Sequence, residues 1–129
     1  MIAVDTNVVV RLLTDDDRQQ TRKATALFAA NEVYVSKTVL LEIEWVLRFS
    51  YELDPEQIDL SLRALLGMPG VVSEEPQQVA LALDWFGQGL EFADALHLAG
   101  SPSAERFITF DRRLIRRAAA IAGPTVEAP

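Results

Sequence analysis

The chain has 129 residues, half of them hydrophobic, and its formal net charge is −7. This length and composition predict one folded domain spanning residues 1–129, and they exclude a disordered tail or a binding peptide. The sequence contains no Cys and only one His, His97, which excludes disulfides, thiolate zinc sites and clustered-histidine metal sites, so any metal must be held by oxygen. The negative charge excludes nucleic-acid binding through the whole surface and leaves only a local basic patch for such a role.

The beginning of the chain and its apolar runs predict a soluble, cytoplasmic protein. Met1 passes directly into a strand-like segment with no basic leader. No apolar run approaches the ~18 residues of a transmembrane helix. We therefore expect no membrane partner.

Short hydrophobic runs alternate with longer segments of helical periodicity along the whole chain. The predicted strands are 2–5, 33–36, 70–73 and 106–110, with a short edge strand at 125–126. The predicted helices are 8–13, 18–30, about 38–51, 54–67, 76–86, about 92–99 and 111–122, with Thr6 as the N-cap of the first. Strands that alternate with helices favour a parallel sheet covered on both faces. We therefore expect an α/β fold with one sheet of four or five strands.

Two acidic residues follow predicted strands. Asp5 closes the apolar run at the start of the chain, and Asp111 comes directly after the fourth predicted strand. Ligands of open parallel sheets bind beyond the carboxyl ends of the strands. Each Asp could instead cap the next helix, an explanation that is strong for Asp111, whereas Thr6 competes with Asp5 for the cap. Thr109 could support a site at Asp111 by hydrogen bonding.

Glu42 lies at the edge of the apolar stripe of its predicted helix, beside Val46. Glu44 on the same helix is expected to point away from this stripe and to form a surface ion pair with Arg48, four residues later. Glu42 has no such partner. An acid without a partner at the edge of an apolar stripe is a candidate site residue.

Asp94 lies in the apolar segment 92–99, where nearly all neighbours are hydrophobic. A structural explanation is an acid in the first helical turn, stabilised by the helix dipole and close to His97. This explanation is compatible with a role in a site. His97 itself is expected to be structural.

Three consecutive acids, Asp15 to Asp17, could be mistaken for a metal site. Runs of acids more often form a solvated loop or a helix N-terminus, where they suit the dipole. We expect that role here.

Four carboxylates, those of Asp5, Glu42, Asp94 and Asp111, therefore stand out. If they face one crevice, they repel one another unless divalent cations neutralise them. Hard oxygen ligands suit Mg²⁺ or Mn²⁺, which bridge phosphate oxygens and activate water. The set predicts a metal site for phosphate chemistry.

A basic cluster near the end of the chain is the one local patch that could contact nucleic acid. Five of the twelve basic residues fall within residues 106–117: Arg106, Arg112, Arg113, Arg116 and Arg117. By itself, this pattern is also typical of a solvated helix face.

Four segments together resemble a PIN-domain protein, and within that group a VapC-type toxin of a bacterial toxin–antitoxin pair. They are Val4-Asp5-Thr6-Asn7, Glu42 in its helix, the segment 92–99 around Asp94, and Ile108 to Leu114. The resemblance spans nearly the whole chain in motif order and length. It implies a three-layer, Rossmann-like α/β/α sandwich with a short, mostly parallel central sheet.

The resemblance also implies an activity, that of a Mg²⁺- or Mn²⁺-dependent endoribonuclease. Asp5, Glu42, Asp94 and Asp111 match the family's acidic quartet, as metal ligands and catalytic residues. The supporting polar positions match Asn7, which could orient a ligand or water, and Thr109. Glu91, one turn before Asp94, could be an auxiliary ligand, although a surface acid is the simpler explanation.

The partners that the resemblance implies are an RNA substrate, a second copy of the chain in a homodimer, and a cognate antitoxin that inserts a segment near the acidic pocket. With RNA as the substrate, Arg112, Arg113 and Arg116 become candidate contacts to its backbone. The same arginines could equally meet an acidic protein.

Two other functions remain open. A non-catalytic interaction module of the same fold would bind a partner without cleaving RNA, and the intact quartet speaks against it. A phosphoacceptor receiver domain also binds Mg²⁺, but it would want an acidic pair after its first strand and a late Lys. Here Asn7 follows that strand, and the only lysines are Lys23 and Lys37.

Overall fold

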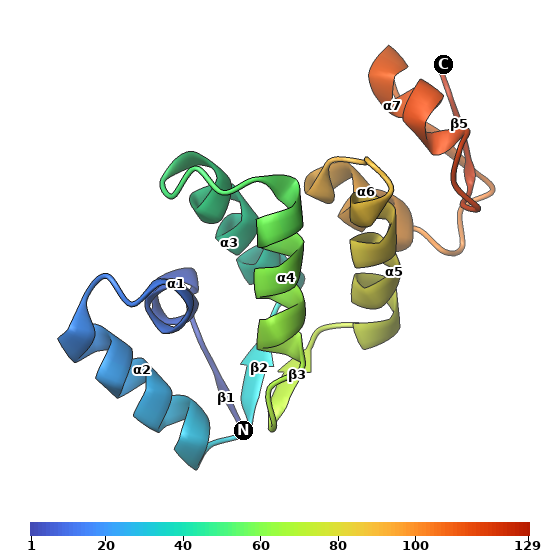
Figure 1. The fold of residues 1–129 in the computed structure, drawn as a ribbon. Helices are drawn as coiled ribbons and strands as arrows, with labels where there is room; N and C mark the ends of the chain where they lie inside the picture. The colour runs from blue at the N-terminus through green and yellow to red at the C-terminus, as the bar shows by residue number, and fades with distance from the viewer. The chain divides into compact units, whose positions relative to one another are not determined.

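The structure is a computed structural model that describes residues 1–129. The chain divides into two compact units, residues 1–76 and 77–129, which Figure 1 shows from blue to red along the chain. Each unit has its own parallel strands and its own helices.

A three-stranded parallel sheet lies in the first unit. Its strands are β1 (Ile2–Ala3), β2 (Val33–Val35) and β3 (Val71–Ser73), in the order β1-β2-β3. The register pairs Ile2 with Val33, and Val33 with Val71. Val33 and Val35 are completely buried. The central strand β2 is therefore covered, as expected for a strand between two parallel neighbours.

Four helices connect these strands. They are α1 (Thr6–Thr14), α2 (Arg18–Ala30), α3 (Lys37–Phe49) and α4 (Pro55–Leu66). In three of these helices, the N-cap side chain accepts a hydrogen bond from the backbone N–H three residues later. Asp17 accepts one from Gln20, and Ser36 accepts one from Val39. Asp54 and Gln57 form a reciprocal capping box. Local sequence signals therefore place the beginnings of these helices.

Aliphatic side chains make the core of this unit. Helix α1 packs on α2 and α3, and α3 packs on α4. Leu40, Ile43 and Leu62 are fully buried. This packing holds the carboxyl-terminal end of β1 close to α3.

The second unit contains a two-stranded parallel sheet and three helices. These elements are α5 (Pro76–Gly87), α6 (Phe92–Ala99), β4 (Arg106–Ile108), α7 (Arg112–Ala118) and β5 (Thr125–Glu127). Strand β4 pairs with β5 in a register that joins Phe107 to Val126. Phe92 is completely buried, and its ring meets that of Phe86 edge-on at 5.5 Å.

The predicted α/β class with a short parallel sheet is confirmed, with five strands and seven helices in the expected order. We expected one sheet, but the five strands form two separate sheets.

The prediction that Thr6 caps α1 is wrong, because Asp5 is the N-cap and Thr6 is the first helical residue. The last helix begins at Arg112 and ends at Ala118, four residues earlier than predicted, and β4 ends at Ile108. No helix is long and apolar enough to cross a membrane.

Candidate active site

Asp5 and Glu42 line one cavity of about 290 Å³ in the first unit. Asp5 follows β1 and accepts a hydrogen bond from the Thr6 backbone N–H at 2.7 Å. Glu42 lies on α3, and its side chain is exposed. Asn7, the predicted supporting residue, lines the same cavity. The first unit therefore brings two of the four predicted carboxylates to one place.

The burial of α3 corrects one sequence prediction. Glu44, expected to point away from the apolar stripe, is only 3 % exposed, because the buried stripe runs through Leu40, Ile43, Glu44 and Leu47. Its predicted ion pair with Arg48 exists, with 3.3 Å between Nε and Oε2, but it is not a surface pair. The buried face of α3 is therefore rotated around the helix axis relative to the predicted face. This rotation leaves Glu42 exposed on the side of the cavity.

The chemistry of this cavity fits a divalent cation. Neither Asp5 nor Glu42 forms an ion pair with a Lys or Arg side chain. The Thr6 hydroxyl oxygen beside them is buried and has no hydrogen-bond partner. Carboxylates that share a cavity without a basic partner, next to a further oxygen, are a suitable part of a ligand set for Mg²⁺ or Mn²⁺.

A hydrogen-bonded cluster around Asp16 borders the cavity. Arg11 and Tyr51 line the cavity, and both donate to Asp16, from Nη1 at 2.6 Å and from the phenol oxygen at 2.5 Å. Thr14 donates to the same carboxylate at 3.1 Å. The bond from Tyr51, followed by those from Arg11 and Thr14, lowers the pKa of Asp16 below its ordinary value. Our sequence analysis missed this cluster, because nothing local links Tyr51 to Asp16.

The triple acid Asp15 to Asp17 takes the structural role predicted for it. Asp15 ends α1 in the left-handed conformation, with φ of 51°, and Asp17 is the N-cap of α2. Asp16 joins the cluster described above. The three acids therefore serve the turn between α1 and α2.

The pH dependence of stability should report on the Asp16 cluster. A carboxyl group with a lowered pKa in the folded state stabilises the fold above its unfolded pKa, and this stabilisation is lost as the pH falls through the folded pKa. We expect Tyr51→Phe to lower the melting temperature at pH 7. The difference from wild type should shrink as the pH falls below about 3.9, the ordinary pKa of an Asp in the unfolded chain, towards the lowered pKa of Asp16 in the fold.

Thermal unfolding measured between pH 7 and pH 3 tests this, with Tyr34→Phe as a matched control. Tyr34 lies in β2 and is half-buried. A Tyr51→Phe difference that stays constant over this pH range would show that the contact with Asp16 does not stabilise the fold.

Asp94 and Asp111 are close enough in the second unit to affect each other. Burial raises the pKa of Asp94, and the negative charges of Asp111 and Glu91 raise it further, against smaller opposite effects of His97 and Arg117. Asp94 lies in the first turn of α6 and is half-buried, while His97 is exposed. A carboxylate held near two others in a partly apolar place is stabilised in its charged form by a cation.

Asp111 caps α7. Its Oδ1 accepts hydrogen bonds from the backbone N–H groups of Arg113 and Leu114, at 2.9 and 3.1 Å. Thr109 accepts a bond from the Asp111 backbone N–H at 3.0 Å, which is the predicted kind of support. The capping explanation that sequence offered for Asp111 is therefore confirmed. The cap uses Oδ1, and no hydrogen bond within the chain uses Oδ2.

The four predicted carboxylates fall into two pairs, one in each unit. Asp5 and Glu42 belong to the first unit, and Asp94 and Asp111 to the second. Neither unit by itself gathers three Asp, Glu or His side chains into a metal-binding group. That all four act on one metal stays a prediction.

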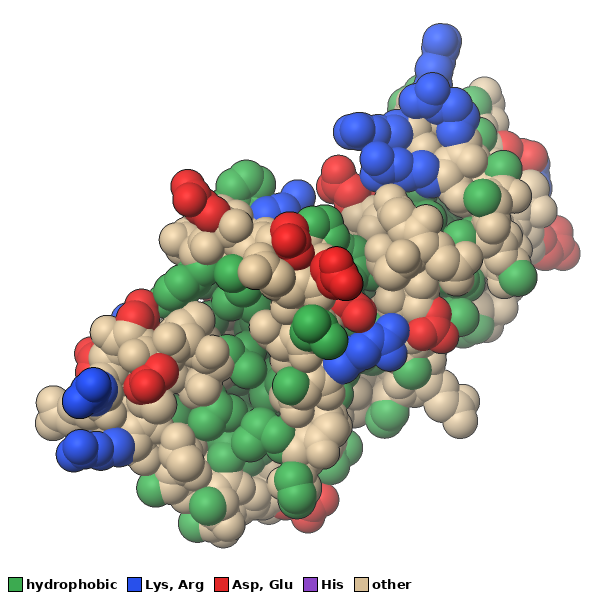
Figure 2. Space-filling model, viewed as in Figure 1, with side chains coloured by type: hydrophobic (Ala, Val, Ile, Leu, Met, Phe, Trp, Pro, Cys, Tyr) green, Lys and Arg blue, Asp and Glu red, His purple; other side chains and the backbone are tan.

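The arginines of α7 form an exposed basic surface. Arg112, Arg113 and Arg116 are exposed, and Figure 2 shows blue side chains gathered over this end of the chain. Arg106 differs, because its guanidinium pairs with Glu127 at 2.6 Å. The α7 arginines therefore keep their charge available for an anionic partner.

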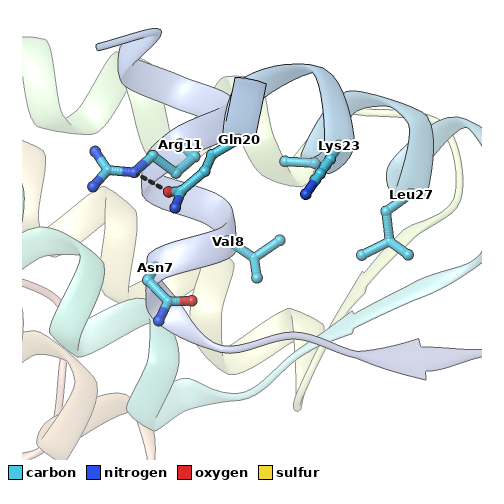
Figure 3. Close-up of a pocket in the computed structure, with 7 residues that line it drawn as sticks. Asn7, Val8, Arg11, Gln20, Lys23 and Leu27 are labelled. Carbon is cyan, nitrogen blue, oxygen red and sulfur yellow. Dashed lines mark hydrogen bonds between the residues drawn. The ribbon is translucent and has the colours of Figure 1, made fainter. Parts of the chain in front are cut away.

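A groove of about 530 Å³ runs between α1 and α2 in the first unit. Its lining includes the apolar side chains of Val8, Ala24 and Leu27, together with Lys23. Figure 3 shows Arg11 and Gln20 joined by a hydrogen bond at one end of this groove. Such a surface can accept an apolar segment of another protein.

Comparisons with known proteins give the family. No curated protein matches the chain. Among solved structures, the chain resembles one from Rickettsia felis, described as VapBC2 bound to a DNA fragment from its promoter, with 18 % identity and a TM-score of 0.41 over 100 % of this chain and 99 % of the other. A similarity of this size does not identify a function. The family model of the PIN domain matches residues 2–120, and the chain therefore belongs to the PIN domain family.

Proposed function

We propose that the protein is a divalent-cation-dependent endoribonuclease and the VapC-type toxin of a toxin–antitoxin pair. The observation that carries this proposal is the PIN-family match over residues 2–120, with an acid at each expected quartet position. PIN domains are in general nucleases. Membership of this family also excludes the receiver-domain alternative.

The carboxylates of Asp5, Glu42, Asp94 and Asp111 would hold Mg²⁺ or Mn²⁺. When bound, the cation supplies positive charge that stabilises the transition state of phosphodiester hydrolysis and lowers the pKa of water. Asn7, which lines the cavity with Asp5 and Glu42, would orient a water molecule or a phosphate oxygen through its amide. Thr109 fixes the backbone of Asp111 and so the direction of its carboxylate. No covalent intermediate with the protein is needed.

The α7 arginines would contact the RNA backbone. Arg112, Arg113 and Arg116 are exposed and follow Asp111 directly in the chain. Guanidinium groups bind phosphate oxygens through two parallel hydrogen bonds. This local positive surface would offset the chain's overall charge of −7, which repels RNA.

The proposed partners follow from the same assignment. A cognate antitoxin would silence the enzyme, and the apolar groove between α1 and α2 is a suitable surface for one of its segments. We further propose a cytoplasmic homodimer, and we propose that the two units together form the single PIN domain, because one family model spans both.

Cleavage of RNA by purified protein tests the proposal. Wild type and Asp5→Asn are incubated with labelled tRNA and ribosomal RNA fragments in Mn²⁺, and the wild type also in a chelator. We expect cleavage only by the wild type with metal. If folded, metal-saturated protein cleaves none of these RNAs, the catalytic proposal fails and the interaction module becomes the better description.

That module is the second candidate function. The apolar side chains of Val8, Ala24 and Leu27 in the groove favour it, because they offer a surface for another protein and have no role in the proposed catalysis. A thermal shift with Mn²⁺ separates the two candidates, since it is expected only if the acids bind metal.

A further inference from the structure

We infer that Arg11 binds a backbone phosphate of the RNA at the cavity that contains Asp5 and Glu42. This inference rests on the proposed function and adds a substrate-binding residue to it. Arg11 is the one basic residue among those that line this cavity. Its side chain is 32 % exposed, so an incoming phosphate can reach it.

The cavity needs a positive charge besides that of any cation. Asp5 and Glu42 have no basic partner within the chain, and two carboxylates repel an approaching phosphodiester. A guanidinium in the same cavity counteracts this repulsion, and it binds phosphate oxygens in a defined geometry.

Two hydrogen bonds fix Arg11 in advance. Its Nε donates to Gln20 Oε1 at 2.7 Å, and its Nη1 donates to Asp16 Oδ1 at 2.6 Å. The guanidinium has five N–H groups, so further donors remain free for a ligand. Because the side chain is already held, little conformational entropy is lost when phosphate binds.

Arg11 is one of three side chains that donate to Asp16. The carboxylate also accepts hydrogen bonds from Tyr51 and Thr14, and so its negative charge is shared among three donors. The cluster is therefore suited to orient the Arg11 guanidinium, and it leaves some of its N–H groups free for a ligand. The competing explanation is a structural role, in which Arg11 only ties α1 to the beginning of α2.

The test measures RNA binding without metal, so that no cleavage occurs. Binding of a fluorescein-labelled single-stranded RNA is followed by anisotropy in EDTA over a series of salt concentrations. We expect Arg11→Gln to weaken binding about 10-fold or more and to reduce the slope of log K against log salt by about 0.7, the contribution of one phosphate contact on a single strand. Arg11→Lys, which keeps the charge, should retain the slope.

Arg63→Gln is the matched control, because Arg63 also pairs with an Asp, at 3.1 Å from Asp59 on α4. An affinity and a slope equal to those of this control would overturn the inference. So would a loss of affinity in Arg11→Gln with an unchanged slope, since that pattern is expected of a structural role. The Mn²⁺-induced thermal shift should survive in Arg11→Gln, because this residue is assigned to phosphate and not to metal.

A second measurement uses the wild-type protein and does not depend on the folding of variants. RNA should protect Arg11 from modification by phenylglyoxal, as read by mass spectrometry, and should leave Arg63 unprotected. Equal modification of Arg11 with and without RNA would overturn the inference. If the wild type cleaves RNA but Arg11 shows neither effect, only the inference fails; if it neither binds nor cleaves RNA, the proposed function fails with it.

Discussion

Replacing Asp94 by Asn should abolish metal-dependent RNA cleavage and leave the metal-free protein at least as stable as the wild type. Loss of one charged ligand removes several kcal/mol of transition-state stabilisation, and about 4 kcal/mol corresponds to about a 1000-fold slower reaction. The stability of the metal-free protein should not fall, because the charged carboxylate of Asp94 is partly buried and close to other negative charges.

The pKa of Asp94 gives the sign of the stability change. Burial, and then the charges of Asp111 and Glu91, raise this pKa in the folded protein. An acid with a raised pKa destabilises the fold once it is ionised, and this effect disappears as the pH falls below the unfolded pKa. Asp94→Asn should therefore melt higher than wild type at pH 7 in EDTA, with the difference fading towards pH 4.

Thermal unfolding in EDTA and cleavage assays in Mn²⁺ check both parts. Asp59→Asn is a suitable control, since Asp59 pairs with Arg63 on α4. If Asp94→Asn retained cleavage, Asp94 would not be a ligand. If it melted well below wild type in EDTA, Asp94 would instead be a structural acid.

Phe92→Ala should produce the largest loss of stability. The side chain is completely buried at the first turn of α6, and its ring packs edge-on against Phe86 at 5.5 Å. Truncation of a buried Phe lowers the free energy of unfolding by about 3–5 kcal/mol, because a cavity remains and the ring contact is lost. A domain at the lower end of ordinary stability, about 5 kcal/mol, would be unfolded to a measurable extent.

Urea denaturation followed by circular dichroism measures this change. Leu60→Ala is the control, because Leu60 lies on α4 and is 64 % exposed, so its free energy of unfolding should change by no more than about 0.5 kcal/mol. A change below about 1 kcal/mol for Phe92→Ala would mean that the second unit lacks a packed core around Phe92.

The sequence alone determined the order of elements and most of their boundaries. Hydrophobic runs located β2 and β3, and Asp54 followed by Pro55 located the start of α4, because capping and backbone restriction act over only a few residues. The segments around Asp5, Glu42, Asp94 and Asp111 were sufficient to recognise a resemblance to the PIN family, and the family model confirms that family. Their role as one quartet stays a prediction.

Tertiary structure decided what depends on contacts between distant segments. Asp16 meets Tyr51 across 35 positions of sequence. The raised pKa of Asp94 depends on its burial and then on the charge of Asp111, the N-cap of α7. The rotation of α3, which buries Glu44 and exposes Glu42, depends on how neighbouring helices pack against it. Sequence periodicity restricts the buried face of a helix to a range of directions, but the packing of side chains against other elements selects one of them.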